Sequence, residues 1–158
     1  MKESKPNVWR DPWHFLAFGC GLGTLPIAPG TFGSLLGLLY YWLMYPLGWA
    51  IYIGLTVLAT VFGFWLCGRV SKDLGVHDHG GIVWDEVVGI LLTFLFVTPS
   101  VSVMLVGFVL FRIFDIWKPW PISFIDKSVK GGVGIMMDDV VAALPAWIFL
   151  QLYVSLTA

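Results

Sequence analysis

The sequence is poor in charged residues. Aspartate, glutamate, lysine and arginine make up 12% of its 158 residues, whereas about a quarter of an average soluble domain is charged. Hydrophobic residues reach 58% and the mean hydropathy is +0.86, and a water-soluble fold of this length cannot bury so much apolar surface. The composition therefore predicts a single membrane domain over residues 1–158, with a polar N-terminal segment over 1–11.

An excess of basic charge and a cysteine framework are also missing. Nine Lys and Arg residues against ten Asp and Glu give a net charge of −1, which excludes a basic patch large enough for nucleic acid. Cys20 and Cys67 lie in or beside apolar stretches, which favours reduced, packed thiols over a disulfide. The first apolar run, from Trp13, is interrupted by glycine and proline and is unlike a signal-peptide core. We therefore expect the N-terminus to belong to the mature protein.

The uncharged stretches predict an all-α, polytopic membrane bundle. Residues 12–68, 87–111 and 140–158 contain no Asp, Glu, Lys or Arg. Glycine and proline divide these stretches into about five helices. The expected helices are Gly33–Tyr45, Trp49–Cys67, Ile82–Val97, Val101–Trp117 and Met136–Leu156, the last with Pro145 as a kink site.

A segment rich in glycine and proline precedes the first of these helices, over residues 19–34. Its irregular backbone predicts a re-entrant loop, because such backbone is tolerated at membrane depth only where protein buries it or water reaches it. The loop could serve packing alone. Alternatively, its amide groups could bind a phosphate together with the hydroxyls of Thr24, Thr31 and Ser34.

The charged residues fall in three blocks, 2–11, 69–86 and 112–139. Five helices threaded through a bilayer place all nine Lys and Arg residues on one side, which the positive-inside rule identifies as the cytoplasm. Acidic residues gather at the same helix ends. Because carboxylates beside hydrocarbon are costly unless they are paired or bind metal, we expect a functional site there.

The segment from His77 to Glu86 combines two histidines with three carboxylates at the start of a predicted helix. Asp85 and Glu86 are about 100° apart on a helix, so only one of them is expected to point at a shared metal. The other would contact the metal-binding acid without binding the metal itself, or would act as a base. Carboxylates dominate and no cysteine joins them, which favours Mg²⁺ or Mn²⁺ over zinc. The alternative is a solvated helix cap with loop histidines.

Two later segments add charge to this end of the bundle. Arg112, Asp115 and Lys118 are spaced three apart and share one side of a helix end, where arginine and lysine suit a phosphate. The cations could instead be snorkelling residues beside an aromatic belt.

A glycine-rich turn leads to Asp138 and Asp139. One of that pair, Asp115 and one acid of the earlier pair would give three helix-borne carboxylates for Mg²⁺.

Four segments together resemble one known family. They are GLGTLPIAPGTFGS (21–34), HDHGGIVWDEVVG (77–89), FRIFDIWKPWPISFID (111–126) and GGVGIMMDD (131–139). In sequence and order they are similar to segments of bacterial phosphatidylglycerophosphatase A. The resemblance implies an all-helical, Mg²⁺-dependent, multi-pass enzyme of the bacterial inner membrane, active at the cytoplasmic face. Its implied reaction in phospholipid biosynthesis hydrolyses phosphatidylglycerophosphate, a lipid of the bilayer, to phosphatidylglycerol and phosphate.

On this interpretation we expect metal-assisted attack of water on the phosphate. The candidate catalytic residues are Asp85, Glu86, Asp139 and His79. The candidate phosphate-binding residues are Arg112, Lys118, Thr31, Ser34 and His77. The candidate metal ligands are Asp85, Glu86, Asp115, Asp138 and Asp139.

Two alternatives stay open at this point. A metal-dependent phospholipid phosphotransferase would need the same acids and a second substrate. An aspartyl-phosphate intermediate would replace direct hydrolysis, whereas a cysteinyl one is disfavoured because no arginine lies six positions after Cys20 or Cys67. A transporter is disfavoured because no charge falls near the predicted midplane. The sequence gives no indication of the oligomeric state.

Overall fold

The computed structural model describes residues 5–158, and this range consists of helices and their connections. Its α-helices are α1 (Pro12–Ala17), α2 (Pro29–Met44), α3 (Trp49–Leu74), α4 (Trp84–Thr93), α5 (Val101–Trp117), α6 (Ile122–Ser128) and α7 (Gly131–Thr157). Two 3₁₀ turns, η1 (Leu22–Thr24) and η2 (Tyr45–Leu47), complete the element order. Residues 1–4 of the predicted polar N-terminal segment lie outside the described range.

The prediction of about five helices is too low, because the described residues form seven α-helices. Each predicted stretch contains a helix, and α5 has the predicted bounds. The two additional helices, α1 and α6, are 6 and 7 residues long, too short to produce a hydropathy signal. Helix α1 depends on a local cap, since the Asp11 side chain accepts hydrogen bonds from the amides of Trp13 and His14.

The other helix bounds differ from the sequence-based ones for identifiable reasons. Helix α3 continues to Leu74, where Gly75 adopts a left-handed conformation (φ 70°) and ends it. Helix α4 stops at Thr93, earlier than predicted. After that point the Leu95 carbonyl accepts hydrogen bonds from Trp147 Nε1 at 2.8 Å and Gln151 Nε2 at 3.0 Å. A longer α4 could not supply a backbone donor to this carbonyl, because residue 99 is a proline without an N–H, and side chains of α7 supply the donors instead.

Helix α4 lies at the centre of the bundle, against α2, α3, α5 and α7. Tyr41 of α2 donates a buried hydrogen bond to the Val97 carbonyl at 2.8 Å, and Tyr52 of α3 donates one to the Leu91 carbonyl at 2.7 Å. Gly37 lets α2 approach α4 closely, since a Cβ there would lie 2.8 Å from Ile90 Cβ. These contacts fix the position of α4, and with it the acidic residues in its first turn.

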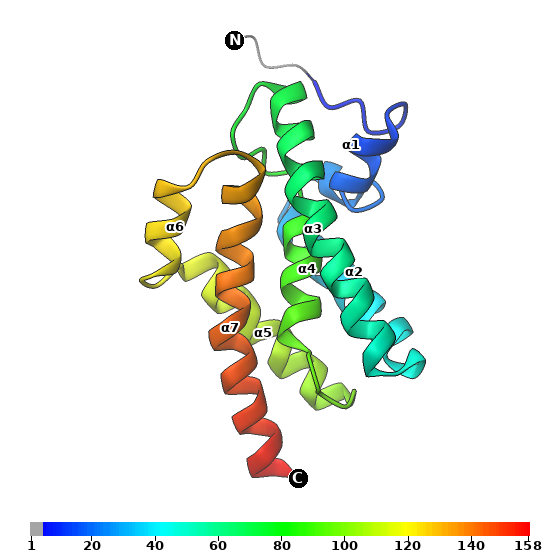
Figure 1. The fold of residues 1–158 in the computed structure, drawn as a ribbon, viewed down its shortest axis with the longest axis vertical. Helices are drawn as coiled ribbons and strands as arrows, with labels where there is room; N and C mark the ends of the chain where they lie inside the picture. The colour runs from blue at the N-terminus through cyan, green and yellow to red at the C-terminus, as the bar shows by residue number, and fades with distance from the viewer. Residues whose placement is uncertain (1–4) are drawn as a thin grey trace.

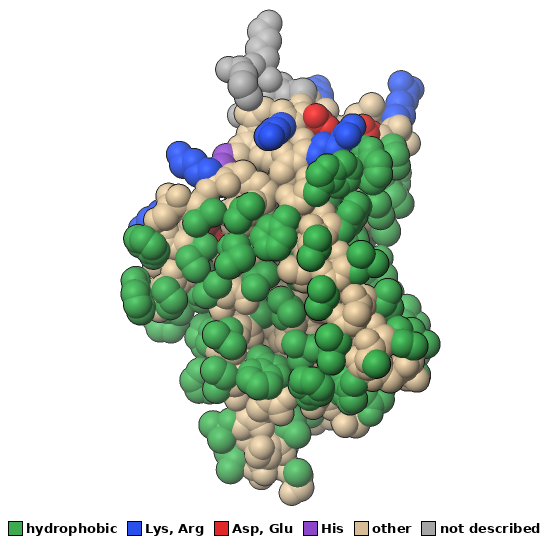
Figure 2. All heavy atoms as spheres, in the orientation of Figure 1, with side chains coloured by type: hydrophobic (Ala, Val, Ile, Leu, Met, Phe, Trp, Pro, Cys, Tyr) green, Lys and Arg blue, Asp and Glu red, His purple; other side chains and the backbone are tan. Residues whose placement is uncertain are grey.

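The surface is that of a membrane protein. Helices α3 and α7 are long and apolar enough to cross a bilayer. Large apolar side chains are exposed along several helices, among them Trp42, Val61, Leu105 and Leu144. Figure 2 shows that such side chains cover most of the visible face, whereas charged side chains gather toward the end at which α1 lies in Figure 1. The protein is therefore membrane-associated, with one polar end.

The helix ends and connections form two groups, one at each end of the bundle (Figure 1). Helix α1, the end of α3, α6 and the start of α7 lie at the charged end; the C-terminus and the α4–α5 connection lie at the other. This agrees with the topology deduced from the charge blocks. The identity of the cytoplasmic side stays a prediction.

The glycine-rich segment lies at the charged end but is not confirmed as a re-entrant loop. Between α1 and α2 the backbone forms turns and η1, and Gly19, Cys20 and Gly21 have positive φ. The segment packs on the loop that precedes α4, since a Cβ at Gly23 would lie 1.9 Å from the Gly81 carbonyl oxygen. At the end of α1, the Ala17 carbonyl accepts a hydrogen bond from the Val83 amide of the same loop at 2.8 Å. Its structural role is thus to support the start of α4.

Candidate active site

Three carboxylates from two helices converge at the charged end of the bundle. Asp85 and Glu86 lie in the first turn of α4, where the helix dipole favours negative charge. Asp139 projects from α7, eight residues after that helix begins at residue 131. One oxygen of each side chain lies within 4.8 Å of the others. We call Asp85, Glu86 and Asp139 the carboxylate cluster.

The position of Glu86 differs from the expectation that only one acid of its pair would point inward. Both side chains contribute an oxygen to the cluster, although their Cα–Cβ bonds diverge by about 100° on the helix. The residues lie in the first turn of α4, and the side chain of Glu86 is one methylene longer than that of Asp85. That length, with the small Gly30 opposite Glu86, accounts for the second inward carboxylate.

The cluster leaves buried oxygen atoms without a hydrogen-bond partner. These are Asp85 Oδ1, Glu86 Oε2 and Asp139 Oδ2, one from each member. Burying an unpaired carboxylate costs several kcal/mol unless a cation compensates it. The donor set consists of oxygen alone, which a hard divalent cation such as Mg²⁺ prefers. The three side chains therefore fit a divalent metal ion.

Helix α5 supplies a fourth carboxylate and the nearby positive charge. Asp115 is buried, and its carboxylate accepts a hydrogen bond from Arg112, one turn earlier on α5. The carboxyl groups of Asp115 and Asp139 are close enough to interact electrostatically. Asp115 thus connects Arg112 to the cluster. One arginine faces four carboxylates, so the site keeps a negative excess that a cation would offset.

The first turn of α2 closes the site from another side. A Cβ at Gly30 would lie 2.5 Å from Glu86 Oε1 and 3.1 Å from Arg112 Nη1, so only glycine fits without displacing these groups. The sequence-based site omitted Gly30. Its position directly after Pro29, at the start of a helix, is the signal that could have indicated it, since the first amides of a helix suit anions.

Asp138 and Lys118 lie in a second polar network, apart from the expected metal and phosphate sites. Lys118 Nζ donates to Asp138 at 2.7 Å and to Asp126 of α6 at 2.8 Å. Burial alone would lower the pKa of Lys118, but these hydrogen bonds raise it. The same contact with Lys118 lowers the pKa of Asp126. The structure therefore assigns Lys118 two carboxylate partners, and a phosphate would have to compete with them.

This arrangement separates the neighbours Asp138 and Asp139. Adjacent residues on α7 point about 100° apart, so Asp139 faces the cluster and Asp138 faces Lys118. The predicted stripe of Arg112, Asp115 and Lys118 is also divided. Helix α5 ends at Trp117 and Lys118 adopts a left-handed conformation, which redirects its side chain. Asp126, which sequence reasoning did not assign, could have been found as the one acid between Asp115 and Asp138.

Three other predicted site residues, His77, His79 and Ser34, make hydrogen bonds with the backbone. His77 Nε2 accepts a hydrogen bond from the Gly131 amide at 2.9 Å, at the start of α7. His79 Nδ1 accepts one from the Gly81 amide at 3.0 Å. Ser34 is buried and its hydroxyl donates to the Gly30 carbonyl at 2.9 Å.

Thr31 is the exception among the predicted hydroxyl ligands. It lies beside Gly30 in the first turn of α2, and its side chain is partly exposed. Its position next to Gly30 keeps it near the site. The roles proposed for Thr31 and for the histidines stay predictions.

Comparisons with known proteins identify the family of the chain. The family described as phosphatidylglycerophosphatase A matches residues 15–154. The chain is 48% identical over 135 residues to phosphatidylglycerophosphatase A of Escherichia coli K12, covering 85% of this chain and 78% of that protein. It is also 48% identical over 139 residues to the Haemophilus influenzae protein of the same name, covering 86% and 85%. No solved structure matches the chain. The chain belongs to the phosphatidylglycerophosphatase A family.

Proposed function

We propose that this protein removes the terminal phosphate of phosphatidylglycerophosphate, releasing phosphatidylglycerol and phosphate in phospholipid biosynthesis. The names of its relatives support the substrate. The structural observation that supports the reaction is the carboxylate cluster, with its three unpartnered oxygens, beside Arg112 at the polar end of an apolar bundle. A lipid phosphate at a bilayer surface would reach such a site without leaving the membrane.

Asp85, Glu86 and Asp139 would hold Mg²⁺. Their donor set is all oxygen, and Mg²⁺ is usually bound by a few carboxylates together with substrate phosphate oxygens. Bound there, the ion supplies Lewis-acid charge to the phosphate and makes water a better nucleophile. Asp115 lies next to this group and supports Asp139 and Arg112.

Arg112 is the phosphate-binding cation of this proposal. Its guanidinium has five N–H donors, and Asp115 uses part of them and fixes its orientation. The remaining donors can bind phosphoryl oxygens, whose charge must be stabilised in the transition state. In the first turn of α2 the amides of Thr31 and Phe32 donate to the Ala28 carbonyl and Pro29 has no N–H, so the donor that this turn can add is the Gly30 amide.

A carboxylate oxygen of the cluster is the proposed base. Water attacks phosphorus, the bond from phosphorus to the glycerol oxygen breaks, and the base takes a proton from the water and delivers it to the departing glycerol oxygen. His79 is a weaker candidate, because its Nδ1 is occupied by the Gly81 amide and its ring packs on Phe18. The lipid alcohol stays in the bilayer through its acyl chains.

We also propose that the protein crosses the bacterial inner membrane several times, with its active site on the cytoplasmic side. The charge distribution supports this orientation, because basic residues favour the cytoplasmic face. The five stretches predicted as membrane helices each contain a helix, and two of these, α3 and α7, are long enough to cross alone. The segment between α1 and α2 would enter the head-group region at the same end.

The test is phosphate release by the detergent-purified protein from phosphatidylglycerophosphate, with Mg²⁺ and again with a chelator. Release that needs Mg²⁺, with phosphatidylglycerol as the lipid product, is the expected result. No release from folded protein in either condition would contradict the proposal. In that case, transfer of the lipid phosphate group to an added alcohol or nucleotide would establish the phosphotransferase alternative.

A further inference from the structure

A groove on the membrane-facing side of α5 leads to the site. It encloses about 370 Å³ and is lined by Phe108, Val109, Arg112, Ile113, Ile116 and Trp117. Apart from Arg112 its walls are apolar, and Val109 and Ile116 are exposed. We call this feature the α5 groove.

The length and position of the α5 groove match one leaflet of a bilayer. From Phe108 to Trp117 the helix rises about 14 Å at 1.5 Å per residue, roughly half of a hydrocarbon core of about 30 Å. Trp117 lies at the charged end of α5, and tryptophan favours the head-group level of a membrane. The groove therefore runs from head-group depth toward the bilayer centre.

Arg112 belongs both to this groove and to the site. It lines the groove, while its guanidinium binds Asp115 and lies close to Gly30, opposite Glu86. The groove therefore combines one positive charge with an apolar lining. A phospholipid has complementary parts, an anionic phosphate joined to apolar chains. A lipid whose chain lies in the groove would meet the positive charge of Arg112 at the depth where its head group begins.

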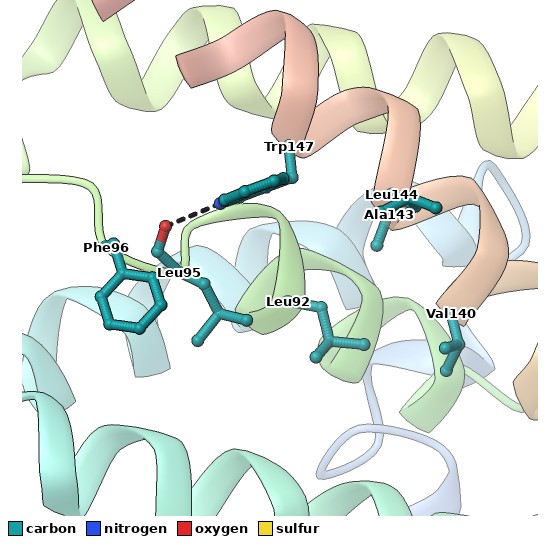
Figure 3. Close-up of a pocket in the computed structure, with 7 residues that line it drawn as sticks. All are labelled: Leu92, Leu95, Phe96, Val140, Ala143, Leu144 and Trp147. Atoms are coloured by element: carbon teal, nitrogen blue, oxygen red, sulfur yellow. Dashed lines mark hydrogen bonds between the residues drawn. The ribbon is translucent and has the colours of Figure 1, made fainter.

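A second groove of about the same volume provides the contrast. It lies between α4 and α7 and is lined by Leu92, Leu95, Phe96, Val140, Ala143, Leu144 and Trp147 (Figure 3). The indole N–H of Trp147 already donates to the Leu95 carbonyl. This lining carries no charged side chain, so it can cover a lipid chain but has no group to bind a phosphate.

We propose that the α5 groove holds an acyl chain of the phospholipid substrate and thereby directs the phosphate past Arg112 to the carboxylate cluster. This inference rests on the proposed lipid phosphatase function. It adds the route by which the substrate enters, from the cytoplasmic leaflet along α5, and implies that a diacyl lipid binds more tightly than a soluble phosphate ester.

The test fills the groove without touching the site. Val109→Trp and Ile116→Trp each add a large ring at an exposed position of the α5 groove, and Leu144→Trp is the matched control in the groove of Figure 3. Each folded variant is assayed in mixed micelles with long-chain phosphatidylglycerophosphate and with a water-soluble, short-chain form. Elution from a sizing column in detergent verifies folding.

We expect the two groove variants to raise KM for the long-chain lipid about tenfold, the loss of contact with about two methylene groups. Their kcat, and their KM for the short-chain form, should stay at wild-type values, as should all values for Leu144→Trp. Equal effects on both substrates, or an unchanged long-chain KM in both groove variants, would overturn the inference. Wild-type protein inactive on both substrates would instead refute the proposed function on which it rests.

Discussion

The ammonium group of Lys118 donates a 2.7 Å hydrogen bond to Asp138, the immediate neighbour of Asp139 in the carboxylate cluster. Two adjacent acids of α7 therefore belong to different networks. Asp139 shares the cluster with the acids of α4, whereas Asp138 joins α7 to Lys118 and, through it, to Asp126 of α6. The two acids should have different functional importance.

Replacement of Asp139 by Asn should abolish turnover, whereas Asp138→Asn should not. Loss of a metal-binding carboxylate removes several kcal/mol of transition-state stabilisation, so we expect kcat to fall at least about a thousandfold for Asp139→Asn. Asp138→Asn should cost about 10- to 100-fold at most, as for a group that supports a ligand. Phosphate release by both purified variants measures this. Equal losses would contradict the separation of the two networks.

Gly30→Ala should impair activity without unfolding the protein. The added Cβ would lie 2.5 Å from Glu86 Oε1 and 3.1 Å from Arg112 Nη1, so these side chains must move from their present positions. We expect kcat/KM to fall about 10- to 100-fold, the usual effect of a small displacement at an active site. Gly54→Ala is the matched control, because a Cβ at that helical glycine meets nothing within 4 Å. Wild-type activity in Gly30→Ala would remove this residue from the site.

Mg²⁺ should stabilise the folded protein through the carboxylate cluster, independently of any activity. At about 100 times its Kd the ion adds about 2.7 kcal/mol, or roughly 5–10 °C in Tm for a chain of this size. The triple variant Asp85→Asn, Glu86→Gln, Asp139→Asn should show no shift. It should also melt higher than wild type without Mg²⁺, because it lacks the unpaired buried charges.

Thermal unfolding in detergent, followed by circular dichroism, measures both effects. Sodium chloride at equal ionic strength controls for general screening of charge. An equal Mg²⁺ shift in wild type and triple variant would place the metal elsewhere.

Arg112→Lys should not preserve function, although it keeps the charge. Lysine lacks the planar set of donors that binds Asp115 and a phosphate together, so we expect KM for the lipid to rise about tenfold or more. Arg69→Lys is the control. Arg69 lies over the rings of Trp13 and Trp65 outside the cluster, and its replacement should leave KM unchanged. Steady-state assays in mixed micelles compare the two, and equal KM values would argue against phosphate binding by Arg112.

The parts of the fold that depend on local sequence could be predicted. Helix α5 has the expected bounds because its signals are local: Ser100 caps its start, where its hydroxyl accepts from the Val103 amide, and Pro119 follows its end. The end of α4 could not be predicted, because it depends on Trp147 and Gln151 of α7, which are distant in the sequence.

The composition of the site could be predicted better than its geometry. Acids beside apolar helices indicate function wherever they occur, which was enough to select Asp85, Glu86 and Asp139. The sequence could not separate Asp139 from Asp138, since that depends on how α7 is rotated against α4. Gly30 was overlooked because its importance arises from its closeness to Glu86, a contact between α2 and α4.

The order in which the site-forming helices occur in the chain has a consequence for biosynthesis. Helices α2, α4 and α5 are synthesised before α7, at roughly 5–20 residues per second, so for several seconds the nascent protein carries Asp85, Glu86 and Arg112 without Asp139. A chain interrupted in that interval would hold an incomplete carboxylate cluster. The cluster is thus complete only after α7 has been synthesised, and translation products that end before α7 should have no activity toward phospholipids.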